Sequence, residues 1–549
     1  MFVREKRIGA YSYLYLVETV RENGKTKQRI IRNLGRTEDV AARGDLDRLA
    51  RSAARLSQRS MILSLLDDDE VPKLSCRRIG AALLFERLWI ESGCRGVMEA
   101  IVAGRRFEFA VERAVFLTVL HRLMVSGSDR ACEHWREDYR IDGIESLQLH
   151  HLYRAMAFLG EQLAETEQAA RTLAPRCIKD AIEEQLFADR RDLFSELSVA
   201  FMDTTSLYFE GGGGETLGQF GHGKDYRPHL KQMIVGVIMD QTGRPVCSEM
   251  WPGNTADVTT LVPVIDRLRR RFAIGKVCVV ADRGMISAET IAALEARGLL
   301  YILGVRERTD KLVRDVVLND AAPFVPLVIE KRKRETNYAA KAVKLGEQRY
   351  IVCINHQEAE KDAAERAAIL AALERQLRRG DKALVGNTGY RRFLKTVGEG
   401  HFAIDRSKAE EDARFDGVFV LRTNTDLNPL VAMLRYKQLW TVEQTFRTAK
   451  HLLATRPIFH KLDETIRGHV FCSFLALVLK AELDARIAAL GHTGSWPAIL
   501  ADLDALTETE VEQDGRRFLL RSAPRPAAGL ALRAAAVALP PTVQAVAAG

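Results

Sequence analysis

The first 36 residues have a pattern of polar and apolar positions that predicts a small antiparallel sheet. Three tyrosines alternate with other residues, as in a half-exposed strand: Tyr11, Tyr13 and Tyr15. Asn23-Gly24 follows, which is a strong signal for a tight hairpin turn. The returning strand over 26–34 carries three cations on one face: Lys27, Arg29 and Arg32. We therefore expect a small basic β unit over 1–45.

Apolar residues recur at helical spacing over the next segment, and near 193 the pattern changes to alternating strands and helices. Residues 46–192 are predicted to be helical. Strands over 197–209, 230–239 and 245–250 then precede a helix, a strand, a helix and a strand that ends at 305. This order is that of a ribonuclease-H-like core.

The order breaks after residue 305. Residues 306–416 mix charged runs with strand-like pieces and are interpreted as an insertion. The core, 193–305, resumes over 417–485 with a strand and two long helices. The last segment, 486–549, is expected to be helical and to end in a loose tail rich in Ala and Pro. The sequence thus predicts a multidomain α/β protein.

The composition is that of a globular protein, because 47% of the 549 residues are hydrophobic and 28% are charged. The longest apolar run, 470–479, is half of the roughly 20 residues that a membrane span needs. The N-terminus has no recognisable signal peptide. Eight cysteines without a CxxC pair argue against a zinc ribbon or a disulfide framework. We therefore expect a cytoplasmic protein with no membrane partner.

The net charge of +8 is concentrated at the N-terminus, where residues 1–60 hold 14 Lys and Arg against 7 Asp and Glu. A basic segment of this kind is a candidate contact for a polyanion. The alternative is a solvated charged surface, and charge alone does not separate the two interpretations.

Two aspartates occupy positions at which α/β sheets often carry chemistry. Asp203 lies within an apolar strand-like run, where a carboxylate loses hydration unless a cation pairs with it. Asp282 directly follows a short buried strand, at the edge where open α/β sheets bind ligands. Taken singly, each is more readily explained as a solvent-facing strand or turn residue.

Glu443 is the only acidic residue between Pro429 and Lys461. On an ideal helix, with about 100° per residue, four side chains fall within about 60° of one another: Tyr436, Glu443, Arg447 and Lys450. A surface pair between Glu443 and Arg447 is the alternative, but it does not explain why no other acid occurs there. Cations around one carboxylate fit a phosphate backbone held beside a metal ligand.

Together the three acids predict a two-metal site for phosphoryl transfer. Asp203, Asp282 and Glu443 would be both the catalytic residues and the metal ligands, because two Mg²⁺ ions need shared carboxylate oxygens. We expect Mg²⁺, with Mn²⁺ able to replace it.

At these motifs the sequence resembles the DDE transposases of bacterial insertion sequences, in particular the cut-and-paste group with a Tyr–(Arg)–Glu–Lys signature. The resemblance covers roughly residues 1–485 and rests on ordered motifs: FMDTTSLYFEG, WPGNTADVTTL, VVADRGMIS and YKQLWTVEQTFRTAKHLL. It implies that the three acids, separated by 79 and 161 residues, are those of the family. It also implies that 306–416 is the β-rich insertion that relatives carry.

The signature itself is matched at Tyr436 and Lys450 but not at its arginine, which is Leu439 here. Arg435 or Arg447 could supply the missing cation. Because Tyr436, Arg447 and Lys450 share the predicted helix face with Glu443, we expect them to hold the DNA strand beside the scissile phosphate.

Further DNA contacts are expected from Lys224 and Arg227, which fall in a matched stretch, with a charged loop as the alternative. The resemblance implies that the small β unit and the helical region recognise the terminal inverted repeats, and that the core cuts and joins DNA. It implies target DNA as a second partner, a homodimer in the synaptic complex, and association with the bacterial nucleoid. No nucleotide cofactor is expected, because the sequence has no GxxxxGK[ST] loop.

Two other functions stay open at this point. One is a metal nuclease of ribonuclease-H-like fold that only hydrolyses DNA. The other is a DNA-binding protein without activity that derives from a transposase, although all three acids are present.

Overall fold

The computed structural model describes the chain apart from residues 23–24, 55–72, 165–167, 169–173, 191–198, 222–226, 273–276, 332–333, 379–391, 398–400, 454, 514–515 and 547–549. The chain divides into two units, the first made of residues 1–81, 138–140 and 495–549 and the second of residues 82–137 and 141–494. In the part of the chain described, no helix is both long and apolar enough to cross a membrane.

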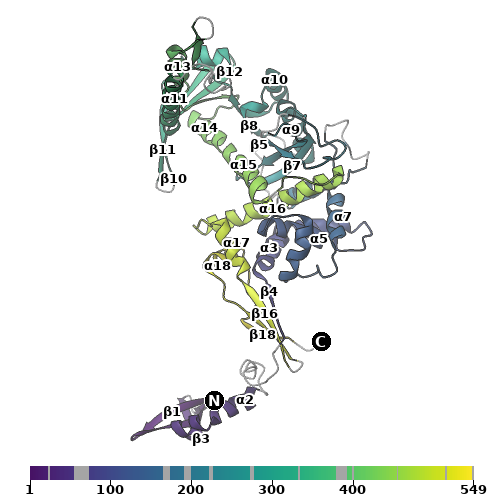
Figure 1. Cartoon of the computed structure of the whole chain (residues 1–549), viewed down its shortest axis with the longest axis vertical. Helices are drawn as coiled ribbons and strands as arrows, with labels where there is room; N and C mark the ends of the chain where they lie inside the picture. Colours follow the sequence, from purple (N-terminus) through teal and green to yellow (C-terminus); the bar gives the residue numbers. More distant parts are fainter. Residues whose placement is uncertain are drawn as a thin grey trace. The chain divides into compact units, whose positions relative to one another are not determined.

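The N-terminal strands form the predicted antiparallel sheet, in the order β1-β2-β3 (Figure 1). The predicted turn at Asn23-Gly24 lies outside the described residues. A register shift leaves Ile31 without a partner, because Leu16 pairs with Arg32 and Val17 with Ile30. The sheet and the helices after it have these bounds: β1 Phe2–Ile8, β2 Tyr11–Glu22, β3 Lys25–Arg36, α1 Thr37–Ala42 and α2 Asp45–Ala54.

The C-terminal residues form a second antiparallel sheet, so the expected loose tail is wrong. Its strands are ordered β18-β17-β16-β4, and β4 comes from the segment predicted to be helical. The strong pairing of β16 with β4 joins segments more than 400 residues apart, which local composition does not reveal. The elements are β4 Lys73–Arg78, α17 Trp496–Asp504, β16 Thr507–Gln513, β17 Arg516–Arg521, α18 Pro526–Ala534 and β18 Val543–Val546.

The helices predicted between about 80 and 190 are present: α3 Gly80–Glu91, α4 Cys94–Val102, α5 Val111–Met124, α6 Asp129–Trp135, α7 Leu149–Gly160 and α8 Ile178–Arg190. Helix α7 packs closely against α16 (Asp463–Ala489). A Cβ at Gly160 would lie 1.9 Å from the Glu464 carbonyl oxygen, and one at Gly468 would lie 1.9 Å from that of Met156. Only glycine permits this approach, which fixes the start of α16.

The large sheet of the second unit has nine strands in the order β10-β11-β12-β15-β9-β8-β5-β6-β7. Strands β5, β6 and β7 pair antiparallel, whereas β5, β8 and β9 run parallel. Helices α9 and α10 connect β7 to β8 and β8 to β9, so the predicted order of strands and helices is confirmed. The bounds are β5 Val199–Tyr208, β6 Gln232–Met239, β7 Pro245–Pro252, α9 Leu261–Arg271, β8 Cys278–Ala281, α10 Ala288–Ala296 and β9 Leu300–Val305.

The segment interpreted as an insertion extends this same sheet. Strand β12 pairs with β15 (Val418–Thr423), and β15 pairs with β9, so three further strands continue the core without a break. In the described residues of this segment, helices α11 and α13 accompany them. The elements are β10 Val325–Lys331, β11 Arg334–Leu345, β12 Gln348–Asn355, α11 His356–Leu377, β13 Leu394–Thr396, β14 Phe402–Ile404 and α13 Arg406–Ala413.

The first of the two long helices predicted within 417–485 is broken. Helix α14 (Pro429–Lys437) ends at Gln438, α15 (Leu439–Arg447) follows at once, and a π-helical turn occupies Thr448–Leu452. Each break changes the angle per residue. The face that Tyr436, Glu443, Arg447 and Lys450 would share on one ideal helix therefore does not follow from helical geometry here. Figure 1 shows α14 and α15 in succession, leading toward α16.

Helix α8 is attached to the edge of the large sheet by buried charges. Six side chains, three of each sign and none more than 10% exposed, meet there: Lys179, Arg267, Arg271, Asp180, Glu183 and Glu249. The Lys179 ammonium donates to Asp180 at 2.8 Å and to the Ser248 carbonyl at 2.7 Å. Although burial favours the neutral acid, Lys179 and Arg271 lower the pKa of Asp180. The charges are therefore balanced within the network.

Removing one charge from this network is expected to be costly, because its partners would stay buried without compensation. We expect Lys179→Met to lower the free energy of unfolding by on the order of 3–5 kcal/mol in denaturant titration. Lys361→Met, which removes an exposed partner of Glu358, is the matched control and should cost less than about 0.5 kcal/mol. Equal losses in the two variants would contradict the importance of the buried charges.

Candidate active site

Parallel pairing brings the first two predicted acids together. Strand β5 pairs with β8 so that Met202 lies beside Ala281, which places Asp203 beside Asp282 as the chain leaves β8. The Thr204 backbone N–H donates to Asp203 Oδ1 at 2.7 Å and so orients that carboxylate. Asp203 is half-buried and Asp282 is exposed. The two carboxylates therefore share one end of the sheet.

Glu443 is brought to the same sheet by α15, which packs against β5 and β6. Its side chain is exposed, between the buried Val442 and the exposed Gln444. The predicted alternative, an ion pair between Glu443 and Arg447, is absent, although both residues are in the part of the chain described. Glu443 is thus left available to an external cation.

Tyr436 connects the helix to Asp282. Its hydroxyl donates to Asp282 Oδ1 at 2.8 Å, and its ring stacks on Phe419 with centroids 6.1 Å apart. Gly304 on β9 leaves the space, since a Cβ there would lie 2.3 Å from the hydroxyl oxygen. Burial and the charges of Asp282 and then Glu443 raise the pKa of Tyr436, so the hydroxyl stays a donor. Tyr436, which we predict to contact DNA, thus also bonds to one of the three acids.

The cations predicted around Glu443 differ in exposure and in position. Arg447 is exposed one turn beyond Glu443, and Lys450 is half-buried in the π-helical turn. Burial raises the pKa of the Cys278 thiol at the start of β8, and the nearby charge of Arg435 opposes this rise. Leu439, at the signature arginine's position, is buried and faces the core. Arg447 remains as the cation nearest in sequence to Glu443.

One of the predicted loop cations and a further acid contact residues of β5. Arg227 is exposed, with its guanidinium 4.7 Å from the centre of the Tyr208 ring, whereas Lys224 lies outside the described residues. Asp257 accepts a hydrogen bond of 2.8 Å from the Thr204 hydroxyl. Sequence reasoning did not include Asp257 in the site. The signal was its place in WPGNTADVTTL, two residues after the turn that follows β7.

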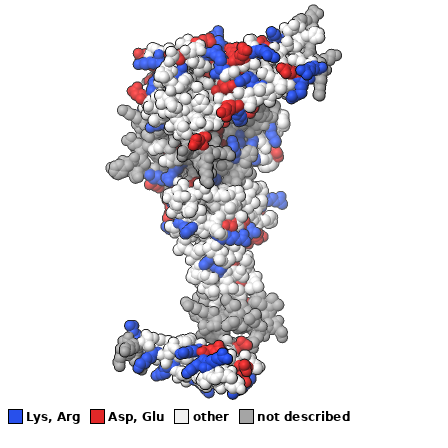
Figure 2. Space-filling view, turned by 90° about the vertical axis from the view of Figure 1, so that its left-hand side faces the viewer, with Lys and Arg blue, Asp and Glu red and all other residues white. Residues whose placement is uncertain are grey.

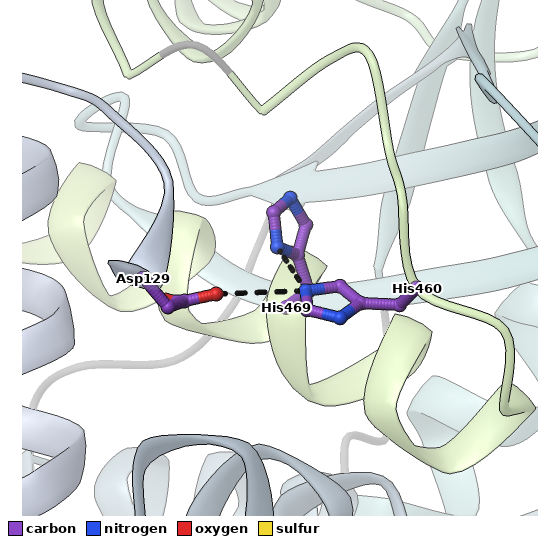
Figure 3. Close-up of side chains that lie close together, drawn as sticks. All are labelled: Asp129, His460 and His469. Atoms are coloured by element: carbon purple, nitrogen blue, oxygen red, sulfur yellow. Dashed lines mark hydrogen bonds and ion pairs between the residues drawn. The ribbon is translucent and has the colours of Figure 1, made fainter. Parts of the chain in front are cut away.

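A separate cluster joins Asp129, His460 and His469 (Figure 3). In the residues that the structure describes, it is the only group of three potential metal ligands with all ligand atoms within 4.8 Å of one another. The His460 Nε2–Asp129 Oδ2 distance is 3.6 Å, and the His460 Nε2–His469 Nδ1 distance is 3.1 Å. Asp203, Asp282 and Glu443, all in the described part of the chain, do not form a group as compact as this one.

The cluster is better explained by Arg122 than by a metal ion. His469 Nε2 donates to the Thr455 carbonyl, so its Nδ1 is the acceptor for Arg122 Nη2 at 2.9 Å. That lone pair is therefore engaged, and a divalent cation would be repelled by the guanidinium. Burial and the charge of Arg122 lower the pKa of His469, which keeps the ring neutral. The cluster ties α5 and α6 to α16 and to the segment before it.

Comparison with known proteins identifies two parts of the chain. Residues 3–68 match the N-terminal domain of IS1634 family transposases, and residues 195–479 match the transposase DDE domain. No curated protein matches the chain. Among solved structures, the chain is similar to the piggyBac transposase synaptic complex with hairpin DNA, determined by cryo-electron microscopy. The identity is 10% over 77% of this chain and 78% of that chain, with a TM-score of 0.36, which does not establish a shared fold.

Proposed function

The chain belongs to the DDE transposases, and we propose that it cuts the ends of an insertion sequence and joins them to target DNA at Asp203, Asp282 and Glu443. The observation that carries the proposal is the register of β5 and β8, which sets two acids side by side, with α15 packed on the same strand. Water would attack the DNA phosphodiester first, and the freed 3′-hydroxyl would attack the target next.

The strand order supports a ribonuclease-H-like core. Numbered within the core as strands 1 to 5, β5, β6, β7, β8 and β9 are arranged 3-2-1-4-5, with the first three antiparallel and strands 1, 4 and 5 parallel. The acids then lie on strand 1, after strand 4 and on a later helix. We propose that the segment over 306–416 serves as the insertion of this core, built onto the same sheet.

The donor set fits hard divalent cations. Three carboxylates supply oxygen ligands only, and neither Asp282 nor Glu443 forms an ion pair with another residue in the described chain. We propose Mg²⁺, with Mn²⁺ able to replace it, held by Asp203, Asp282 and Glu443. Bound there, the ions would lower the pKa of the attacking hydroxyl or water and stabilise charge on the leaving oxygen.

The surrounding cations would hold the DNA. We propose that Arg447, Lys450 and Arg227, together with Lys224, contact phosphates and position the strand without reading bases. We propose that Tyr436 contacts the DNA strand as well, and that its hydroxyl orients Asp282, to which it is bonded. The Tyr436–Glu443–Lys450 spacing supports membership of the Tyr–(Arg)–Glu–Lys group, and we propose a homodimer in the synaptic complex.

Amide substitution tests the three acids without changing side-chain shape. We expect Asp203→Asn, Asp282→Asn and Glu443→Gln each to lower cleavage of end DNA in Mg²⁺ by about 100-fold or more, since even residues that only orient metal ligands cost 10–100-fold. Binding of the same DNA in Ca²⁺ should persist. Glu289→Gln, in the exposed first turn of α10, is the control and should cut normally. Near-normal cleavage by any of the three would remove that residue from the site.

A wild-type strand-transfer assay separates transposition from hydrolysis alone. Joining of pre-cut ends to a supercoiled plasmid is expected. Products of hydrolysis without joined ends would favour the simple nuclease, and no metal-dependent product of either kind would favour a DNA-binding protein without activity.

Tyr436→Phe tests whether the hydroxyl orients Asp282. The phenylalanine ring keeps the stack on Phe419, so the melting temperature should change little. The Mg²⁺ concentration for half-maximal cleavage should rise about 10–100-fold, as for other partners of metal ligands. Tyr338→Phe is the control, because the Tyr338 ring contacts Lys437 of α14, the helix that carries Tyr436. This variant should keep the wild-type Mg²⁺ requirement. An unaltered Mg²⁺ requirement in Tyr436→Phe would reduce the tyrosine to a packing role.

A further inference from the structure

The N-terminal sheet has two faces of different chemistry, which the strand pairing defines. Along β2, residues 11, 13, 15, 17, 19 and 21 point to one face, and residues on β1 and β3 join the face of their partners. We call the face that carries the three tyrosines the tyrosine face. It comprises Phe2, Arg4, Lys6, Ile8, Tyr11, Tyr13, Tyr15, Val17, Thr19, Arg21, Thr26, Gln28, Ile30, Asn33 and Arg36.

The tyrosine face carries four cations and, among its described side chains, no acid. The opposite face also has cations, but it includes Glu5 and Glu18 and is packed by α1 through Val40 against Gly35. Glu18 forms an ion pair with Arg29 there. The predicted basic side of β3, with Lys27, Arg29 and Arg32, is this opposite face. The sequence therefore predicted a basic sheet, but the face that it identified as basic also carries acidic residues.

Two of the four cations on the tyrosine face are ordered by neutral groups, which leave their charge uncancelled. The Arg36 guanidinium lies 3.9 Å from the centre of the Tyr11 ring, and its Nε donates to the Tyr13 hydroxyl at 3.4 Å. Arg4 donates to Gln28 at 2.8 Å across the central strand. In the described part of the chain, none of Arg4, Lys6, Arg21 and Arg36 forms an ion pair. All four side chains are exposed.

This arrangement fits phosphates better than bases. A base-stacking platform needs open aromatic rings, whereas the Tyr11 ring is already covered by Arg36. A ring beneath a guanidinium holds it in place and lowers the side-chain entropy lost when an anion binds. At the lower end of Figure 2, where Figure 1 draws β1 and β3, Lys and Arg side chains are visible together with some Asp and Glu.

We propose that the tyrosine face of the N-terminal sheet is a docking surface for the phosphate backbone of duplex DNA, with Arg4, Lys6, Arg21 and Arg36 as its contacts. The choice of DNA as the polyanion rests on the proposed function. Contacts of this kind position the protein on DNA and carry no base sequence. Each phosphate that a cation neutralises releases counterions, so the contacts can be counted from the salt dependence of binding.

The test compares equal charge removal on the two faces of one sheet, in the full-length chain. The first variant combines Arg4→Ala, Lys6→Ala and Arg36→Ala. The matched control combines Arg7→Ala, Lys27→Ala and Arg32→Ala, which all lie on the opposite face. Binding to a duplex with the element's end sequence and to an unrelated duplex is measured over a range of salt, with EDTA present so that no cleavage occurs.

The first variant should lower the slope of log affinity against log salt by about 2.7, which is roughly 0.9 for each lost contact, on both duplexes alike. The control should keep the wild-type slope, and both variants should keep the wild-type melting temperature. An equal fall in both variants would overturn the proposal, since net charge alone would then explain it. An unchanged slope in the first variant would also overturn it.

Two further results keep the outcomes separate. A single-stranded oligonucleotide should compete less well than a duplex of the same length, and stronger competition would contradict duplex docking. Cleavage in Mg²⁺ by the wild-type protein is measured on the same preparation. Normal cleavage without the slope change would reject the docking surface alone, whereas the slope change without any cleavage would reject the proposed function alone.

Discussion

The parallel pairing of β5 with β8 is the interaction on which the candidate site depends. Side chains in a sheet have a period of two, so a shift of one residue would turn Asp203 to the other face. The pairing of Met202 with Ala281 instead sets Asp203 beside Asp282. A buried apolar cluster beneath them, which includes Ala200, Met202 and Ala281, holds this register. Apolar packing thus decides where the charged groups lie.

Carboxylates held close together repel one another, and the surrounding structure has to oppose this repulsion. The Thr204 N–H donates to Asp203, and the Tyr436 hydroxyl donates to Asp282. The third acid is carried by a separate helix, which packs on β5 without any direct bond from Glu443 to the others. The site is therefore assembled from rigid elements but keeps charge that a divalent cation would neutralise. Asp282 and Glu443 are exposed at this end of the sheet.

Much of the core could be predicted from local patterns. Apolar runs gave the strands from β5 to β9 in the right order, and the acids stood out because each occupies an apolar or basic surrounding. The features that could not be predicted depend on contacts between distant segments or on breaks in a helix. The pairing of β4 with β16 and the joining of β12 to β15 leave little local signal. Tyr436, near the end of α14, bonds to Asp282 on a distant part of the chain, which ideal helical spacing could not indicate.

The buried charge networks also could not be predicted from local sequence patterns. In the sequence, Lys179 and Asp180 are typical of an exposed, charged turn of a helix. In the structure both are buried against β7 and α9. His469 lies in an apolar helix and gives no ligand spacing, and its partner Arg122 is more than 300 residues away in sequence. Charged residues far apart in the chain are brought together only by the packing of helices. Their pairing therefore has to be read from the structure.

The most direct test of the account is the position of bound Mn²⁺ in crystals of the full-length protein, located by anomalous diffraction. Mn²⁺ accepts the same oxygen ligands as Mg²⁺ and can be identified by its own signal. The account predicts anomalous peaks in contact with Asp203, Asp282 and Glu443, and none at His469. A peak between Asp129, His460 and His469, with none at the three acids, would contradict it.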